Sequence, residues 1–365
     1  MPVTSTARLL AIVLIGLALL LSVVPGPASA APGPAAEDDE GGTEKLRRDL
    51  DKATAGYNNA RAKAQASQKR RAALINQIAG AEKRITVLEE QVQELSAAAY
   101  RRGLPDPATA MANSRSLPDL IGNVGLVDSL TRQRTKTLDD LVDTRADLVA
   151  ARRGVDAELA KQRTEEKTMR RRRDDAERAL AAAKVGGQKS GGFTSDGENR
   201  DVPAATGNGS PAAPEKKTTR KKTRKATAAP RRGDGSYGSE GCSQDDPTSG
   251  GCLTPRTLHA LQQTKAAGFT RYVHCFRQAS FGEHPKGRAC DFAAAPGGFG
   301  GAATGGDRAY GNRLAAWFVD NADRLGVLYV IWYRQIWLPG SGWRAYQRGG
   351  DPSSAHTNHV HLSVQ

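Results

Sequence analysis

Aromatic residues make up only 5% of this 365-residue chain, and they are unevenly spread. All four tryptophans (Trp317, Trp332, Trp337 and Trp343) fall in the last fifty residues. A compact core depends on large apolar side chains, so we expect one near the C-terminus and fewer domains than the length alone would allow.

The sequence also has no C-x-x-C pair, which argues against a zinc site built from cysteines. Its four cysteines lie in the C-terminal third, and an even number in an exported protein suggests disulfides. Of the three possible pairings we favour Cys242–Cys252, which closes a local loop, and Cys275–Cys290, which joins two strands.

Only one long apolar run is present, at residues 9–24. Arg8 precedes it and Ala28-Ser29-Ala30 follows it, so residues 1–30 are predicted to be a secretory signal peptide cut after Ala30. The alternative is an uncleaved membrane anchor, although about 16 apolar residues is short for a spanning helix. Neither interpretation is cytoplasmic, and the predicted localisation is secreted, extracellular or associated with the cell wall.

The net charge is +14, and the basic excess is concentrated in "EKKTTRKKTRKATAAPRR", residues 215–232. This stretch has no aromatic side chains on which bases could stack, so nucleic acid is not the expected partner. It predicts a solvated tether that either binds anionic cell-wall polymers or merely stays soluble. Together with the Gly, Ser, Thr and Pro around it, it predicts a disordered basic linker over residues 186–240.

Residues 43–185 show a heptad pattern. Apolar residues recur at alternating steps of four and three, at Leu74, Ile78, Ala81, Ile85, Leu88, Val92, Leu95 and Ala99. That spacing predicts a coiled-coil helix. A second apolar series runs from Leu126 to Leu159, where Arg145 and Arg152 interrupt the seam.

A breaker separates the two series, because Gly103, Pro105, Pro107 and Pro118 cannot lie inside one continuous helix. Two arms, each roughly 90 Å long, would fold back into an antiparallel hairpin; one long parallel dimer is the rival. The segment "AAAYRRGLPDPATAMANSRSLPDLIGNVGLVDSLTRQR" resembles the hinge of coiled-coil segments on secreted bacterial cell-wall hydrolases and their activators. The resemblance implies a following peptidase domain and a division-associated membrane complex as partner.

Residues 241–365 change character and mix strand-like runs such as "VLYVIWY" and "HVHLSV" with helical stretches. Thr254 before Pro255 fits a helix N-cap, and Gly268 fits the end of that helix. The predicted fold class is therefore an α+β C-terminal domain, with a small antiparallel sheet and helices, behind an α-helical coiled-coil hairpin.

All six histidines lie in this domain, and three of them cluster in "HTNHVHLSV". In a strand, His359 and His361 would point to the same face. With His284 and Asp291 elsewhere in the chain, His361 would give zinc two nitrogens and one oxygen and leave a position open for water. His359 could then take the proton of that water.

The motif "HPKGRACD" fits H-x-x-G-x-A-x-D, and "HVH" fits the H-x-H that follows it. Together they resemble the zinc D-alanyl-D-alanine peptidases and murein endopeptidases, which implies Zn2+ at His284, Asp291 and His361. It also implies His359 beside the metal-bound water and, from "HCFRQ", Arg277 facing the substrate. The chain departs from the carboxypeptidases in having Gly282 where serine is usual, and it lacks their E-x-x-H, which leaves the general base undetermined.

The remaining histidines have less specific predictions. His259 is expected to be a surface or core residue of a helix and His274 to be structural, whereas His356 is either a partner of the site or a loop residue. The sequence therefore predicts a secreted zinc peptidase acting on peptide stems or cross-links of peptidoglycan, which the hairpin would position or restrain. The alternative is a non-catalytic module that binds the wall or activates a hydrolase.

Overall fold

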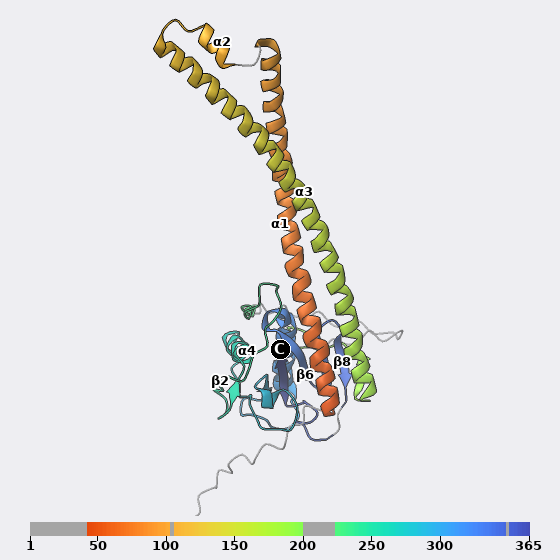
Figure 1. Cartoon of the computed structure of the whole chain (residues 1–365). Coiled ribbons are helices and arrows are strands. Elements are labelled where there is room, and N and C mark those ends of the chain that lie inside the picture. Colours follow the sequence, from red (N-terminus) through yellow and green to blue (C-terminus); the bar gives the residue numbers. More distant parts are fainter. Residues whose placement is uncertain (1–41, 103–105, 200–222, 348–349) are drawn as a thin grey trace, which may run out of the picture. The chain divides into compact units, whose positions relative to one another are not determined.

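The structure is a computed structural model that describes residues 42–102, 106–199, 223–347 and 350–365 (Figure 1). These residues all belong to one compact unit, Asp39–Gln365. The predicted signal peptide lies outside the described residues. No helix in the described ranges combines the length and the apolar character needed to span a membrane.

Two long helices, α1 (Glu44–Arg102) and α3 (Leu117–Ala182), run side by side and form the predicted hairpin (Figure 1). Between them lies the short helix α2 (Pro107–Ala112). Two prolines of the breaker lie in the first turn of a helix: Pro107 directly follows the N-cap Asp106, and Pro118 stands two positions after the N-cap Ser116. Gly103 and Pro105 lie outside the described residues. The missing N–H of proline costs nothing in the first turn, where the backbone has no helical partner.

The helices approach closely along the predicted seam. A Cβ atom on Gly154 of α3 would lie 3.0 Å from Leu74 of α1, so glycine permits this contact. The arginines that interrupt the second apolar series reach across the seam, with Arg145 bonded to Glu89 at 2.5 Å and Arg152 to Glu82 at 2.8 Å. These pairs are exposed, so they contribute little to stability and chiefly fix the register of the two helices.

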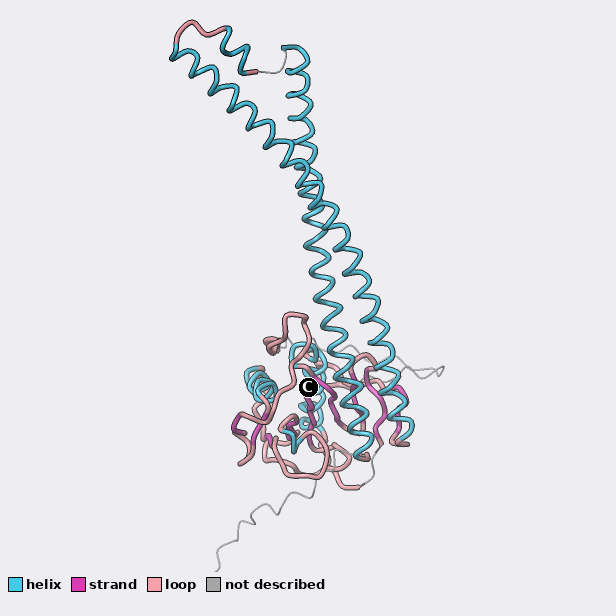
Figure 2. The backbone as a smooth tube through the Cα atoms, viewed as in Figure 1, coloured by secondary structure: helices cyan, strands magenta, loops and turns pink. Residues whose placement is uncertain are grey.

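Among the described residues, the C-terminal part is built on a seven-stranded antiparallel sheet with the order β1-β8-β7-β6-β9-β5-β4. Figure 2 shows its strands in magenta, gathered at the base of the two long helices. A separate pair, β2–β3, lies outside it, and three helices and one 3-10 turn complete the domain. This confirms the predicted fold class of a helical hairpin followed by an α+β domain. The bounds are β1 (Gly186–Lys189), β2 (Gln244–Asp245), β3 (Cys252–Leu253), α4 (Pro255–Ala266), β4 (Val273–His274), η1 (His284–Lys286), β5 (Ala289–Ala293), α5 (Gly305–Asp320), α6 (Ala322–Leu325), β6 (Val327–Trp332), β7 (Gln335–Leu338), β8 (Gly342–Tyr346) and β9 (His359–Val364).

The two faces of the sheet pack against different helices. On one face Val330, Val360 and Leu362 join a core with side chains of α4 and α5. Alternation along the strands sends Tyr329 and Ile331 to the other face, where they pack with apolar residues of α1 and α3. The hairpin therefore packs on one face of the sheet and shares with it a hydrophobic cluster separate from that of α4 and α5.

Parts of the segment with linker-like composition pack against the domain. β1 pairs with β8, and the buried Phe193 contacts Trp343 edge-on with ring centroids 4.9 Å apart. Farther along, the buried Tyr237 lies against the guanidinium groups of Arg231 and Arg256. A few apolar side chains thus anchor a stretch whose overall composition is polar, while residues 200–222 lie outside the described part.

Candidate metal centre

His284, Asp291 and His361 are brought together by one turn and two neighbouring strands. His284 begins η1, where Pro285 fixes the first turn and Gly287 ends it in the left-handed conformation, with φ 66°. A Cβ atom at Gly287 would lie 2.4 Å from Cys242 Sγ, so only glycine fits there. Asp291 on β5 and His361 on β9 are directly opposite partners, so both project from the same face of the sheet.

The three side chains converge on one point. His284 Nε2 lies 3.2 Å from both Asp291 Oδ2 and His361 Nδ1, and His361 Nδ1 lies 2.8 Å from Asp291 Oδ1. The ligand atoms of a tetrahedral zinc site, with bonds of about 2 Å, are about 3.3 Å apart. All three residues are 0% exposed. The spacing and the burial both fit a metal site with two imidazole ligands and one carboxylate ligand.

The outer nitrogen of each histidine ligand is engaged, which fixes the nitrogen that faces the centre. His284 Nδ1 is bonded to the backbone carbonyl of Cys275, and His361 Nε2 is bonded to Ser363 Oγ at 2.7 Å. With Nδ1–H of His284 donating to the carbonyl, its Nε2 carries the lone pair toward the centre. Such outer partners orient metal-binding imidazoles and raise their basicity.

Asp291 is held as a carboxylate. Burial alone would raise its pKa, but His284, His359 and Arg277 outweigh that effect and hold the pKa well below 3.8. Arg277 Nη1 donates to Asp291 Oδ2 at 2.6 Å. Arg277, expected to face the substrate, therefore contacts a candidate metal ligand directly, and its side chain is only partly exposed.

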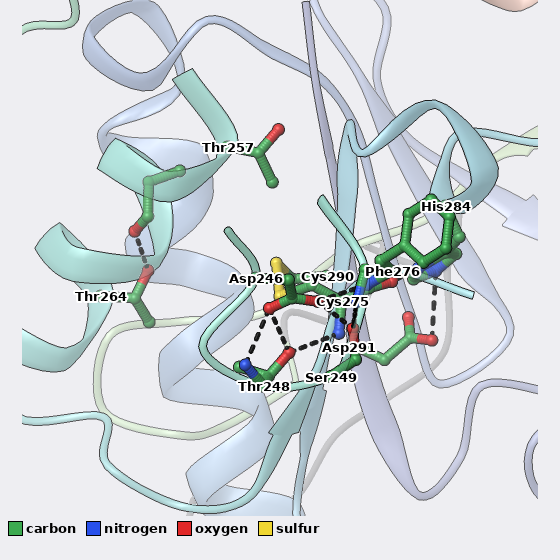
Figure 3. Close-up of a disulfide and its surroundings, with 12 residues drawn as sticks. Asp246, Thr248, Ser249, Thr257, Thr264, Cys275, Phe276, His284, Cys290 and Asp291 are labelled. Carbon is green, nitrogen blue, oxygen red and sulfur yellow. Dashed lines mark hydrogen bonds and ion pairs between the residues drawn. A yellow bond between two sulfur atoms is a disulfide. The ribbon is translucent and has the colours of Figure 1, made fainter. Parts of the chain in front are cut away.

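A disulfide and a polar loop brace the backbone beneath this group (Figure 3). The structure joins Cys275 to Cys290, next to Asp291, and it joins Cys242 to Cys252, which is the pairing favoured from the sequence. Asp246 accepts a hydrogen bond from the backbone N–H of Phe276 at 2.8 Å, beside the carbonyl that holds His284. The two disulfides indicate an oxidising, extracytoplasmic environment.

His359 lies beside the three candidate ligands, with Nε2 3.4 Å from Asp291 Oδ1. Its other nitrogen, Nδ1, lies 2.7 Å from Asn358 Oδ1, and Asn358 is itself held by Gly300 O and Ser353 Oγ. With Nδ1–H as donor to Asn358, the lone pair of His359 Nε2 points toward the centre. Nε2 of His359 therefore faces the three candidate ligands.

His356 is also part of this cluster. Its ring centroid lies 4.8 Å from that of His359 and 5.7 Å from that of His361, and it adopts a left-handed backbone conformation with φ 50°. Burial holds its pKa well below 6.5, with contributions from the neighbouring imidazoles and from Arg47. Its buried Nδ1 has no hydrogen-bond partner among the described residues. A strained, buried imidazole with an unused nitrogen is typical of a functional position.

The edge strand β4 lines the more open side of the cluster. His274 pairs with Asp291 across β4 and β5, so His274, Asp291 and His361 form one row on the same face of three strands. His274 is only half-buried. Next to it, Tyr272 is 46% exposed and packs edge-on against Phe299, whose ring lies 5.4 Å from that of His359. His259 lies apart, on α4, bonded to Thr227 O.

Several contacting residues were not singled out from the sequence. Ser363 follows His361 by two positions, so strand alternation alone would have placed it on the same face. Asn358 directly precedes the H-x-H motif, but no pattern in the sequence indicates that it contacts the site. Tyr329, whose ring stacks on that of His361 with centroids 5.6 Å apart, comes from β6 and could not be assigned without the sheet order.

The described residues define a protein with a long helical hairpin and an α+β domain that carries a buried His/Asp/His group able to bind a metal. Residues 249–360, which include this group except for His361, match the family model described as VldE, C-terminal domain. No curated protein and no solved structure matches the chain.

Proposed function

We propose that this protein is an exported zinc metallopeptidase that cleaves peptide stems or cross-links of bacterial peptidoglycan. The observation that carries the proposal is the convergence of His284, Asp291 and His361 at mutual distances of 2.8–3.2 Å, with His359 beside them. The two disulfides support export, and the motif resemblance supports peptidoglycan as substrate.

The roles of the residues follow from their contacts. His284, Asp291 and His361 would hold the zinc, which when bound supplies a Lewis acid and lowers the pKa of a coordinated water to about 7. His359 would accept and return a proton at Nε2, while Asn358 keeps its ring in place. Arg277 would orient the substrate carbonyl or carboxylate when its contact with Asp291 loosens.

The second candidate is a non-catalytic module that retains the fold and the metal and binds the wall or activates a hydrolase. The lack of E-x-x-H favours it, because the chain then has no counterpart of the carboxylate base of the carboxypeptidases. In the proposal above, an imidazole must serve instead, so the two candidates differ in whether His359 has a chemical role.

Mass spectrometry of muropeptides, before and after incubation with the zinc-loaded full-length chain, separates the two. If the protein is a peptidase, we expect new muropeptide fragments whose masses identify the bond that is cut. The rate at which they form should decrease at least about a hundredfold in His359→Ala, since general acid–base groups contribute roughly that much. His259→Ala is the matched control, since this histidine lies outside the cluster. No new fragments, with zinc bound, would favour the non-catalytic module.

A further inference from the structure

The base of the hairpin packs on the face of the sheet that carries the candidate metal site. We use "hairpin base" for Leu46–Ala53 of α1 and Ala176–Leu180 of α3, whose buried apolar side chains pack against β6, β7 and β8. Ile331 of β6 is the direct partner of His361, and Tyr329 is the partner of Ser363. The surface under the hairpin base is therefore continuous with the metal-binding row.

Arg47 of the hairpin base lies close to a candidate ligand. It is 1% exposed, its Nη2 donates to Tyr346 Oη at 2.6 Å, and its guanidinium carbon lies 5.2 Å from the centre of the Tyr329 ring. The Tyr329 ring in turn stacks on that of His361, with an angle of 10° between the planes. One aromatic ring thus separates the hairpin from the metal centre.

Polar contacts hold the hairpin base around this apolar patch. Asp51 pairs with Arg288 at 2.7 Å, and Arg288 lies between the turn that carries His284 and the strand that carries Asp291. Glu177 pairs with Arg344 at 2.7 Å, and just beyond the hairpin base Asn58 Nδ2 donates to Val327 O at 2.8 Å. A buried guanidinium and ion pairs are costly in a permanent core but common where two parts of a chain dock reversibly.

The site beneath is closed. The three candidate ligands are 0% exposed, and His356 and His359 are 1% exposed. A wall polymer is too large to reach such a group unless part of the surrounding structure moves. On the side toward β6, the part that would have to move is the hairpin base.

We propose that the hairpin base is an intramolecular cover of the metal-bearing face, and that the contacts described here are those of the closed state. A polymer can reach the site from the side of β6 only when the hairpin base is displaced. The ion pair between Asp51 and Arg288 is one of the contacts that this displacement breaks. This inference rests on the site of the proposed function but not on its catalytic activity.

The test uses the metal-free full-length chain and the modification of histidines by diethyl pyrocarbonate, followed by peptide mass spectrometry. Asp51→Arg places like charges together and should open the cover. We expect the modification rates of His356 and His359, relative to His259 in the same molecule, to rise about tenfold, equivalent to about 1.4 kcal/mol. Asp49→Arg, the same charge change at a partly exposed residue of the hairpin base that pairs with Lys45 in the same helix, should leave the rates unchanged.

Equal rates in Asp51→Arg and the original chain, with circular dichroism showing both folded, would overturn the proposal, as would an equal rise in Asp49→Arg. If Asp51→Arg does not fold, Leu50→Ala provides the same comparison, because Leu50 is a fully buried contact of the hairpin base. The labelling needs neither zinc nor substrate, so a failed peptidase assay would not affect it.

Discussion

Asp291 and His361 face each other across two adjacent antiparallel strands, with Oδ1 of the carboxylate 2.8 Å from Nδ1 of the imidazole. Strand register alone places them opposite, although 70 residues separate them in the chain. A short turn then brings His284 to the same point. The geometry of the site therefore depends on the sheet, and on the groups that hold each ring in place.

Ser363→Ala should weaken zinc binding without unfolding the domain. Ser363 Oγ is hydrogen-bonded to Nε2 of His361 and orients its ring. Loss of such a partner typically costs 10- to 100-fold in metal affinity, so we expect roughly that decrease. Competition with a chromogenic chelator measures it. Ser190→Ala is the control, since Ser190 lies next to the edge strand β1, away from β9, and its Oγ has no described hydrogen-bond partner. Equal losses of zinc affinity in both variants would contradict the role given to Ser363.

Replacing Cys275 and Cys290 together with alanine should lower the free energy of unfolding by about 3 kcal/mol, the entropic value for a loop of about 15 residues. These cysteines are separated by 15 positions, and they join the segment just after β4, whose Cys275 carbonyl holds His284, to the strand that carries Asp291. We therefore also expect zinc affinity to fall. Urea unfolding and zinc titration of the same sample measure the two effects, and unchanged values for both would count against the bracing role.

Glu158→Gln should destabilise the hairpin by about 1–2 kcal/mol at pH 7, since it weakens charge-assisted hydrogen bonds. Glu158 of α3 is buried and accepts hydrogen bonds from Lys161 and from Ser67 and Arg70 of α1, which together lower its pKa from 4.5 to about 2. The folded pKa is depressed, so the stabilisation is complete above pH 4.5 and is lost as the pH falls toward 2.

Urea unfolding of both proteins across this pH range checks the prediction. The difference in stability between Glu158→Gln and the original chain should narrow as the pH falls from 4.5 toward 2. The exposed Glu166→Gln is the matched control and should show little difference at any pH. A difference that stays constant down to pH 2 would mean that the charge of Glu158 is not what stabilises the hairpin.

The features that could be predicted from the sequence are those encoded by short-range spacing. The four-three alternation from Leu74 onward and the prolines at 107 and 118 specify two helices and their break, because both are local backbone properties. The motif around His284 and Asp291 is equally local. His359 and His361 could be assigned to one face because side chains alternate along a strand.

The features that could not be predicted depend on contacts between distant segments. The glycine-rich stretch after Asp291 has the composition of a loop, yet its second part begins α5, where a Cβ atom on Gly311 would lie 2.3 Å from the Trp332 ring. Phe193 and Tyr237 anchor a stretch whose composition suggests a linker. The position of Arg47 near the site could not be predicted from any sequence pattern, because its neighbours Tyr329 and Tyr346 lie nearly three hundred residues away in the chain.

Metal analysis of the purified full-length chain tests the central claim most directly. Inductively coupled plasma mass spectrometry at neutral pH should find about one zinc per chain, retained in His259→Ala and lost in His284→Ala, Asp291→Ala and His361→Ala. Absence of zinc from the original chain after zinc loading, or its retention at full occupancy in all three ligand variants, would contradict the assignment of a metal centre.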